Sequence, residues 1–164
     1  MKRIATHRKP DADAVVSIWL VQRYLFAGEA VEIIFLSRSA RFSDVADCLV
    51  DVSNVFDAQR LIFDHKPPAF TDRNLTCATK LVWEHLVFLG KPVEHLALLV
   101  QVMHEGDRNP PGKASEELIR SRTDGLHARI TSTRALNLTD HEFYSTICTW
   151  LDAYDANSRR AGNL

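Results

Sequence analysis

Cysteine is scarce in this 164-residue sequence, which contains three cysteines and no Cys-x-x-Cys pair. The odd count and wide spacing exclude a thiolate zinc motif and do not suit a disulfide framework. Long apolar runs are also missing, because none approaches the ~20 residues of a membrane span. The short run after Met1 is broken by His7, which is unlike a secretory signal. These absences predict a soluble protein in the reducing cytoplasm.

An excess of one charge is absent as well. The sequence has 20 Lys and Arg against 21 Asp and Glu, so its formal net charge of −1 provides no global attraction to nucleic acid. Some cations could still form local basic patches, although ordinary solvated charge is the alternative. These cations are Arg38, Arg41, Arg108, Lys113, Arg120 and Arg122.

With 46% hydrophobic residues, the chain suits one sizeable core better than two, so we expect a single domain over residues 1–164.

What the sequence does contain is a set of four apolar runs that end in acidic or histidine residues. The runs are residues 4–6, 48–50, 61–63 and 96–103, and they lead into His7, Asp51, Asp64-His65-Lys66 and His104-Glu105-Gly106-Asp107. In an open parallel sheet, functional groups gather outside the carboxyl ends of the strands. The repetition therefore predicts one shared polyvalent site.

Six residues form the candidate ligand set of that site. They are His7, Asp11, Asp13, Asp51, His65 and Asp107. Hard oxygen donors with two imidazoles suit Mn²⁺, Mg²⁺ or Fe²⁺ rather than a thiolate zinc site. Four carboxylates without cations would repel one another, whereas two ions ~3.5–4 Å apart would neutralise them, activate a bridging water and polarise a phosphoryl oxygen. The pattern predicts phosphoester hydrolysis.

Asp107 also fits a loop that ends a helix, because residues 106–112 are rich in Gly and Pro. His104 or Glu105 could then take its place as a ligand. Two further histidines lie within apolar helical patterns and are interpreted as packed side chains rather than ligands: His85 and His95.

Alternating strand and helix patterns predict an α/β fold with a mostly parallel sheet flanked by helices, followed by a helical C-terminal segment. Strands are expected at residues 3–6, 31–37, 48–52 and 61–64, and helices at 11–27, 44–48, 76–89, 92–104 and 115–134. A capping box at residues 139–142 starts a last helix with one apolar face. We expect a motif-bearing core at 1–110, a helical extension at 111–158 and a frayed tail at 159–164.

The motifs resemble those of the DHH phosphoesterase superfamily, which carries His-x-x-x-Asp-x-Asp, an isolated Asp, Asp-His-His and a later Asp. Residues 7–13 reproduce the first motif, Asp51 the second, and Asp64-His65-Lys66 the third with its last position altered. Asp107 is a looser match to the fourth. Residues 50–70 and 76–82 also look like the melanocyte-proliferating-gene branch of related exonucleases. The resemblance spans residues 1–110 and implies a DHH-type domain without the second lobe of many such enzymes.

The resemblance implies that the six ligand residues bind metal, with Asp51 bridging two ions and Asp64 supporting the site. It makes Asp51, His65 and Lys66 the catalytic residues, and Lys66 with Arg108 the substrate-binding residues. Lys66 stands where the family has a histidine that approaches the substrate phosphate. A lysine ammonium can hold a phosphate oxygen, but it does not shuttle protons near neutral pH unless its pKa is strongly lowered.

We therefore expect a metal-dependent phosphoesterase, a hydrolase that cleaves a phosphodiester in a nucleotide or short oligonucleotide by metal-activated water. The expected cofactor is a pair of Mn²⁺ ions, with Mg²⁺ as the alternative. The substrate would be a phosphorylated small molecule or a nucleic acid end, and a second copy of the chain could supply a lid. One alternative is a non-catalytic phosphate- or nucleotide-binding protein, and another is a subunit of a hetero-oligomeric enzyme.

Overall fold

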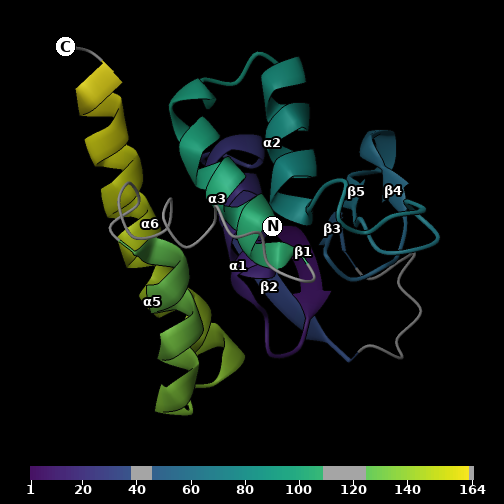
Figure 1. The fold of residues 1–164 in the computed structure, drawn as a ribbon, viewed down its shortest axis with the longest axis horizontal. Coiled ribbons are helices and arrows are strands. Elements are labelled where there is room, and N and C mark those ends of the chain that lie inside the picture. The colour runs from purple at the N-terminus through teal and green to yellow at the C-terminus, as the bar shows by residue number, and fades with distance from the viewer. Residues whose placement is uncertain (38–45, 109–124, 163–164) are drawn as a thin grey trace.

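The structure is a computed structural model that describes residues 1–37, 46–108 and 125–162 (Figure 1). Its described strands form one sheet in the order β2-β1-β3-β5-β4. Their bounds are β1 Lys2–His7, β2 Val31–Leu36, β3 Cys48–Val50, β4 Phe56–Asp57 and β5 Ile62–Phe63. All neighbouring strands are parallel except β4 and β5, which are antiparallel. The predicted α/β class with a mostly parallel sheet is confirmed.

Helices pack against this sheet and against one another. The α-helices are α1 Ala12–Leu20, α2 Ala78–Phe88, α3 Ala97–Asp107, α5 Leu126–Thr133 and α6 Asp140–Gly162. Shorter helical turns are the π turn Val21–Leu25 and the 3₁₀ turns Ala58–Arg60, Glu94–Leu96 and Arg134–Leu136. No helix of the described residues has the length and apolar character needed to cross a membrane.

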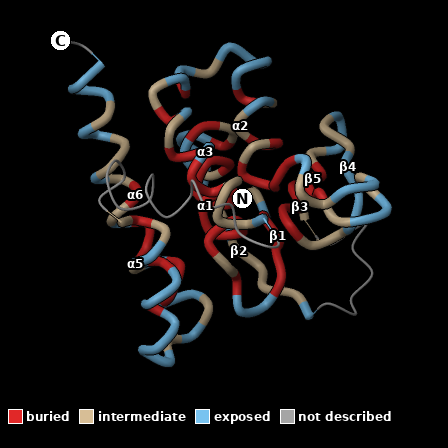
Figure 2. Tube along the Cα trace, viewed as in Figure 1, coloured by how far each residue is buried: buried red, intermediate tan, exposed pale blue. Residues whose placement is uncertain are grey.

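The main core lies between the sheet and the helices. Every residue of α1 is buried, because α1 contacts the sheet together with α2, α3 and α6 (Figure 2). Along β1 and β3 the side chains alternate: Ile4 and Val50 belong to this core, while Ala5 and Leu49 form a smaller cluster with Ile62. Buried apolar side chains thus fix the register of the strands whose ends carry the polar motifs.

Several element boundaries differ from the prediction. The helix expected at residues 11–27 is α-helical only to Leu20, and the helix expected from residue 92 becomes α-helical only at Ala97. No helix forms in residues 46–48, because Asp47 accepts a hydrogen bond from the Arg3 backbone at 2.7 Å and leads into β3. The expected helix of residues 115–124 and the basic residues Arg38, Arg41, Lys113, Arg120 and Arg122 lie outside the described residues.

The predicted start of α6 is confirmed, whereas its predicted end is not. The Thr139 backbone donates to the Glu142 carboxylate at 2.9 Å, and Glu142 donates to the Thr139 hydroxyl at 3.2 Å, as in a capping box. Residues 159–162 are helical rather than frayed. The reason is that Arg159 donates hydrogen bonds to Asp155 at 3.1 Å and to the hydroxyl of Tyr24 at 2.7 Å.

Asp155 joins α6 to the rest of the protein. Its Oδ1 accepts from the Tyr24 hydroxyl at 2.6 Å and lies 2.5 Å from His95 Nε2. Burial raises the pKa of Asp155, but the bonds from His95, Tyr24 and Arg159 outweigh this and lower it. His95 is therefore a packed, paired side chain, as the sequence predicts.

Substituting Asp155 by alanine should lower the free energy of unfolding by roughly 1–3 kcal/mol, because three donors lose a charged acceptor. Urea denaturation would measure this change. Glu84→Ala is the control, since Glu84 forms an exposed pair with Lys80 at 4.0 Å, and its loss should cost less than about 0.5 kcal/mol. Equal losses in the two variants would contradict the role assigned to Asp155.

Candidate metal centre

The carboxyl ends of three adjacent parallel strands carry the first three motifs. His7 is the last residue of β1, Asp51 follows β3, and Asp64 with His65 follows β5. Because β3 pairs with both β1 and β5 in parallel, these side chains emerge at the same edge of the sheet. Asp11 reaches the same edge as the N-cap of α1, where its Oδ1 accepts from the Ala14 backbone at 3.0 Å.

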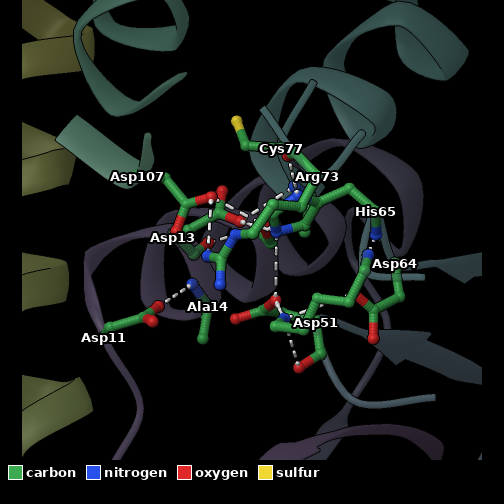
Figure 3. A network of polar contacts seen from close by, with 12 residues as sticks. Asp11, Asp13, Ala14, Asp51, Asp64, His65, Arg73, Cys77 and Asp107 are labelled. Atoms are coloured by element: carbon green, nitrogen blue, oxygen red, sulfur yellow. Dashed lines mark hydrogen bonds and ion pairs between the residues drawn. The ribbon is translucent and has the colours of Figure 1, made fainter. Parts of the chain in front are cut away.

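Asp51 lies at the centre of the site (Figure 3). Its side chain is 2% exposed; Oδ2 lies 3.1 Å from His7 Nε2, and Oδ1 lies 3.7 Å from His65 Nε2. Its backbone has a φ of 55°, a left-handed conformation that costs free energy in a residue other than glycine. The strand end therefore turns sharply at the residue whose two oxygens face the two histidines.

His65 presents an unsatisfied nitrogen to the site. Its Nδ1 must donate to the carbonyl oxygen of Arg73 at 2.8 Å, because a carbonyl can only accept. Among the described residues, the buried Nε2 has no hydrogen-bond partner. It lies 3.2 Å from an oxygen of Asp107, 3.7 Å from Asp51 and 3.9 Å from Asp13. A backbone acceptor on one nitrogen and a free lone pair on the other is the usual arrangement of a metal-binding histidine.

His7 is also held through its Nδ1, but its Nε2 is hydrogen-bonded to Asp51. Its Nδ1 donates to the carbonyl oxygen of Arg8 at 2.9 Å, so Nε2 faces Asp51. Burial lowers the pKa of His7, but the hydrogen bond and charge of Asp51 raise it above its ordinary value. The carboxylate at this position thus attracts positive charge.

Two overlapping groups of ligand atoms result. The first comprises His7, Asp11 and Asp51, and the second Asp13, Asp51 and His65; within each group the ligand atoms lie within 4.8 Å of one another. Asp51 belongs to both groups. This arrangement would allow Asp51 to bridge two ions, each held by carboxylate oxygen and imidazole nitrogen.

Asp13 has a second role in the fold. Its two oxygens accept from the backbones of Ala78 and Thr79, each at 2.8 Å, at the N-terminus of α2. Helix N-termini attract carboxylates without any metal. Since each carboxylate oxygen has a further lone pair, these bonds also orient Asp13 toward the site while leaving it acceptor capacity.

Asp107 reaches the site from the end of α3 rather than from a strand. Asp107 is the one among residues 104–107 that meets His65, whereas His104 contacts the Asn74 carbonyl at 3.0 Å and Glu105 pairs with Arg108 at 3.6 Å. The expected alternatives to Asp107 are therefore turned away from the site. Arg108, expected to bind substrate, is exposed and paired with Glu105 instead of a site residue.

The centre has a deficit of positive charge. Burial, together with Asp11 and Asp13, raises the pKa of Asp51 to about 6, although His7 and Lys66 oppose this. Burial and the neighbouring charges of Asp13 and Asp51 likewise raise the pKa of Asp107. The carboxylates and the free lone pair of His65 are suitable ligands for divalent cations. Binding of such cations would remove the repulsion between the buried carboxylates.

Lys66 supplies part of the missing positive charge. Its ammonium group contacts Asp51 Oδ1 and lies 3.3 Å from Asp64 Oδ1. Burial lowers the pKa of Lys66, but the charges of Asp51 and Asp64 outweigh it and raise the pKa above the ordinary value. Lys66 therefore stays charged, and it faces the carboxylates as well as a cavity of about 370 Å³ whose lining includes His7 and Asp11.

Asp64 holds the loop that carries His65 and Lys66. Its Oδ1 accepts from the backbones of both residues, at 2.7 and 3.2 Å, and its Oδ2 accepts from the Asn54 backbone at 2.8 Å. These bonds connect the turn after β3 to the turn after β5. Asp64 thus supports the site, and its oxygens already serve backbone donors.

Arg73 is a site residue that sequence reasoning missed. Its carbonyl fixes His65, and its guanidinium lies 3.9 Å from Asp107. It stands in a polar stretch between Asp72 and Asn74, where an arginine resembles ordinary surface charge, so the sequence contains no signal for this position.

The fold and the centre define the chain as an α/β protein with a buried carboxylate and histidine cluster at the carboxyl edge of its sheet. No family model, curated protein or solved structure matches the chain. Function must therefore be argued from the chemistry of the site.

Proposed function

We propose that this protein is a metal-dependent phosphoesterase that hydrolyses a phosphodiester in a nucleotide or short oligonucleotide. The observation that carries the proposal is the position of Asp51, whose carboxylate belongs to both ligand groups. When bound, two divalent ions would neutralise the carboxylates, polarise the phosphoryl group and lower the pKa of an attacking water. Mn²⁺ suits these oxygen and imidazole donors, with Mg²⁺ as the alternative.

The side chains of the site have separate roles in this proposal. His7 and His65 each direct Nε2 to the centre, because their Nδ1 atoms are held by backbone carbonyls. A metal ion would replace the proton in the hydrogen bond from His7 Nε2 to Asp51. Asp11, Asp13 and Asp107 would complete the ligand set. The order of these motifs, together with the parallel sheet beneath them, supports a DHH-type arrangement of the fold.

The cavity beside Lys66 would admit the substrate. It has a volume of about 370 Å³, and its rim includes Ser53, Asn54 and Pro67. A phosphate that enters here could displace the Lys66 ammonium from Asp51 and take it as a counter-ion. The polar lining favours a nucleotide or the end of a nucleic acid over an apolar ester, and a second copy of the chain could close over the opening.

One contact favours a second candidate function. Because the ammonium of Lys66 already pairs with Asp51, it could replace one of the two cations. The protein would then bind phosphate or a nucleotide with at most one metal ion and would not hydrolyse it.

Lys66→His separates the two functions. If the protein is an enzyme, the wild type should already hydrolyse bis(p-nitrophenyl) phosphate with Mn²⁺. The variant should then bind Mn²⁺ about tenfold more tightly at pH 8, because a competing charge is gone. Its kcat should change by less than about tenfold. Calorimetry and product absorbance would measure the two effects, with Lys80→His as the control, since Lys80 is half-buried on α2 and pairs with Glu84 outside the site. Hydrolysis that appears only in the variant would instead identify a binding protein.

A further inference from the structure

A second cavity opens onto the same carboxylates from the side of α5. It has a volume of about 250 Å³ and lies where α5 contacts α1 and α3. Asp11, Asp13 and Asp107 line one wall, and His127, Thr131 and Arg134 line the other. His127 therefore faces the wall of carboxylates, whereas the Thr131 hydroxyl donates to the His127 carbonyl oxygen at 3.0 Å and Arg134 donates to backbone carbonyls.

The imidazole of His127 packs against Gly106. A Cβ atom at Gly106 would overlap this ring, so the ring occupies the space that a side chain at position 106 would need. Gly106 directly precedes Asp107, so the contact places His127 beside the carboxylate edge. Within the described part of the chain, the ring nitrogens of His127 make no hydrogen bond. The ring is half-buried and lines the cavity.

Burial lowers the pKa of His127, although the charge of Asp11 opposes this. An imidazole has at least one N–H to donate in either protonation state. In the described ranges, no oxygen holds the ring nitrogens of His127, unlike those of His7, His65 and His95.

Arg134 connects the segment after α5 to the loop that carries the first motif. Its guanidinium donates to the carbonyl oxygens of Lys9 and Pro10, the two residues before Asp11, and lies over the ring of Phe143 with 5.8 Å to the centroid. The segment containing His127 is thus connected to the loop between β1 and α1. Movement of α5 away from the centre would break these bonds.

We propose that this second cavity is an additional phosphate subsite of the enzyme, besides the cavity at Lys66, and that His127 donates a hydrogen bond to a substrate phosphate oxygen there. The proposal rests on the proposed function, because the carboxylate wall accepts a phosphate only when cations neutralise it. The phosphate would lie between the two walls, with oxygens toward the metal-binding residues and one oxygen toward α5.

The test compares His127→Leu with His127→Gln. Leucine keeps the bulk against Gly106 but removes the donor, whereas the glutamine amide keeps an N–H near the ring position. Calorimetry would measure binding of inorganic phosphate to Mn²⁺-loaded protein. We expect phosphate affinity to fall about tenfold in the leucine variant and less than about threefold in the glutamine variant. The affinity for Mn²⁺ should be unchanged in both variants. The far-UV circular dichroism spectrum, which reports folding, should also be unchanged.

His85→Leu is the matched control, because His85 is also half-buried with a pKa lowered by burial and packs on Phe63 away from the site. Unchanged phosphate affinity in His127→Leu, with normal Mn²⁺ binding, would overturn the subsite and leave the proposed function intact. Equal losses in both His127 variants would show a packing effect and also overturn it. Failure of the wild type to bind Mn²⁺ would overturn both proposals. If His127→Leu does not fold, His127→Ala provides the same comparison.

Discussion

Asp51→Asn should abolish detectable Mn²⁺-dependent phosphodiester hydrolysis, a loss of at least about 10³-fold. Asparagine keeps the size of the side chain but removes the negative charge and one of the two oxygens. Both ligand groups contain Asp51, so the substitution weakens both at once. Hydrolysis of a short oligonucleotide and of bis(p-nitrophenyl) phosphate, each with and without Mn²⁺, would measure the loss.

Asp57→Asn is the control for this substitution. Asp57 lies at the end of β4 and caps the next turn by accepting from the Arg60 backbone at 3.2 Å, outside both ligand groups. Its loss of charge should leave hydrolysis within about twofold. Circular dichroism would verify that both variants fold. Hydrolysis in Asp51→Asn within tenfold of the wild type would contradict the bridging role of Asp51.

The metal-free protein should become less stable as the pH rises from about 4 to 8. The pKa of Asp51 is 3.8 in the unfolded chain and about 6 in the folded protein. Between these values the folded state holds a proton that the unfolded chain has released, so the free energy of unfolding falls as pH rises. The raised pKa values of Asp107 and His7 act in the same direction and extend the window toward neutral pH. We expect a loss of roughly 1–3 kcal/mol.

Urea denaturation at pH 5 and pH 8, with and without Mn²⁺, would measure this dependence. Mn²⁺ at about 100 times its dissociation constant should add about 2.7 kcal/mol at pH 8 and much less at pH 5, where protons compete for the ligands. Lowered pKa values of His85 and His127 oppose the trend, so Asp51→Asn is the necessary comparison. The free energy of unfolding of the metal-free wild type could instead rise from pH 5 to pH 8 as steeply as that of Asp51→Asn. This result would contradict the claim that the centre lacks positive charge.

The sequence was sufficient to predict that His7, Asp51 and His65 come together. Short apolar runs that end in polar residues mark strand ends, and parallel strands place those ends at one edge. The same reasoning does not extend to Asp107, because it lies at a helix end and its position depends on how α3 packs. For this reason the sequence left Asp107, His104 and Glu105 as alternatives.

Other features depend on contacts that no local pattern contains. One such feature is the contact of the Lys66 ammonium with Asp51, which forms because the buried carboxylates attract the nearest flexible cation. His127 belongs to no motif, and Gly106 reads in sequence as a turn signal. The missing side chain of Gly106 leaves space for the ring of His127, and this is visible only when α5 lies against α3.

The central claim is that the carboxylates and histidines at the sheet edge form a dinuclear metal centre. A calorimetric titration of metal-stripped protein with Mn²⁺ tests this claim without any assumption about the substrate. We predict two ions per chain for the wild type, and the loss of both tight sites in Asp51→Asn. Absence of Mn²⁺ binding by the folded wild-type protein would contradict the account.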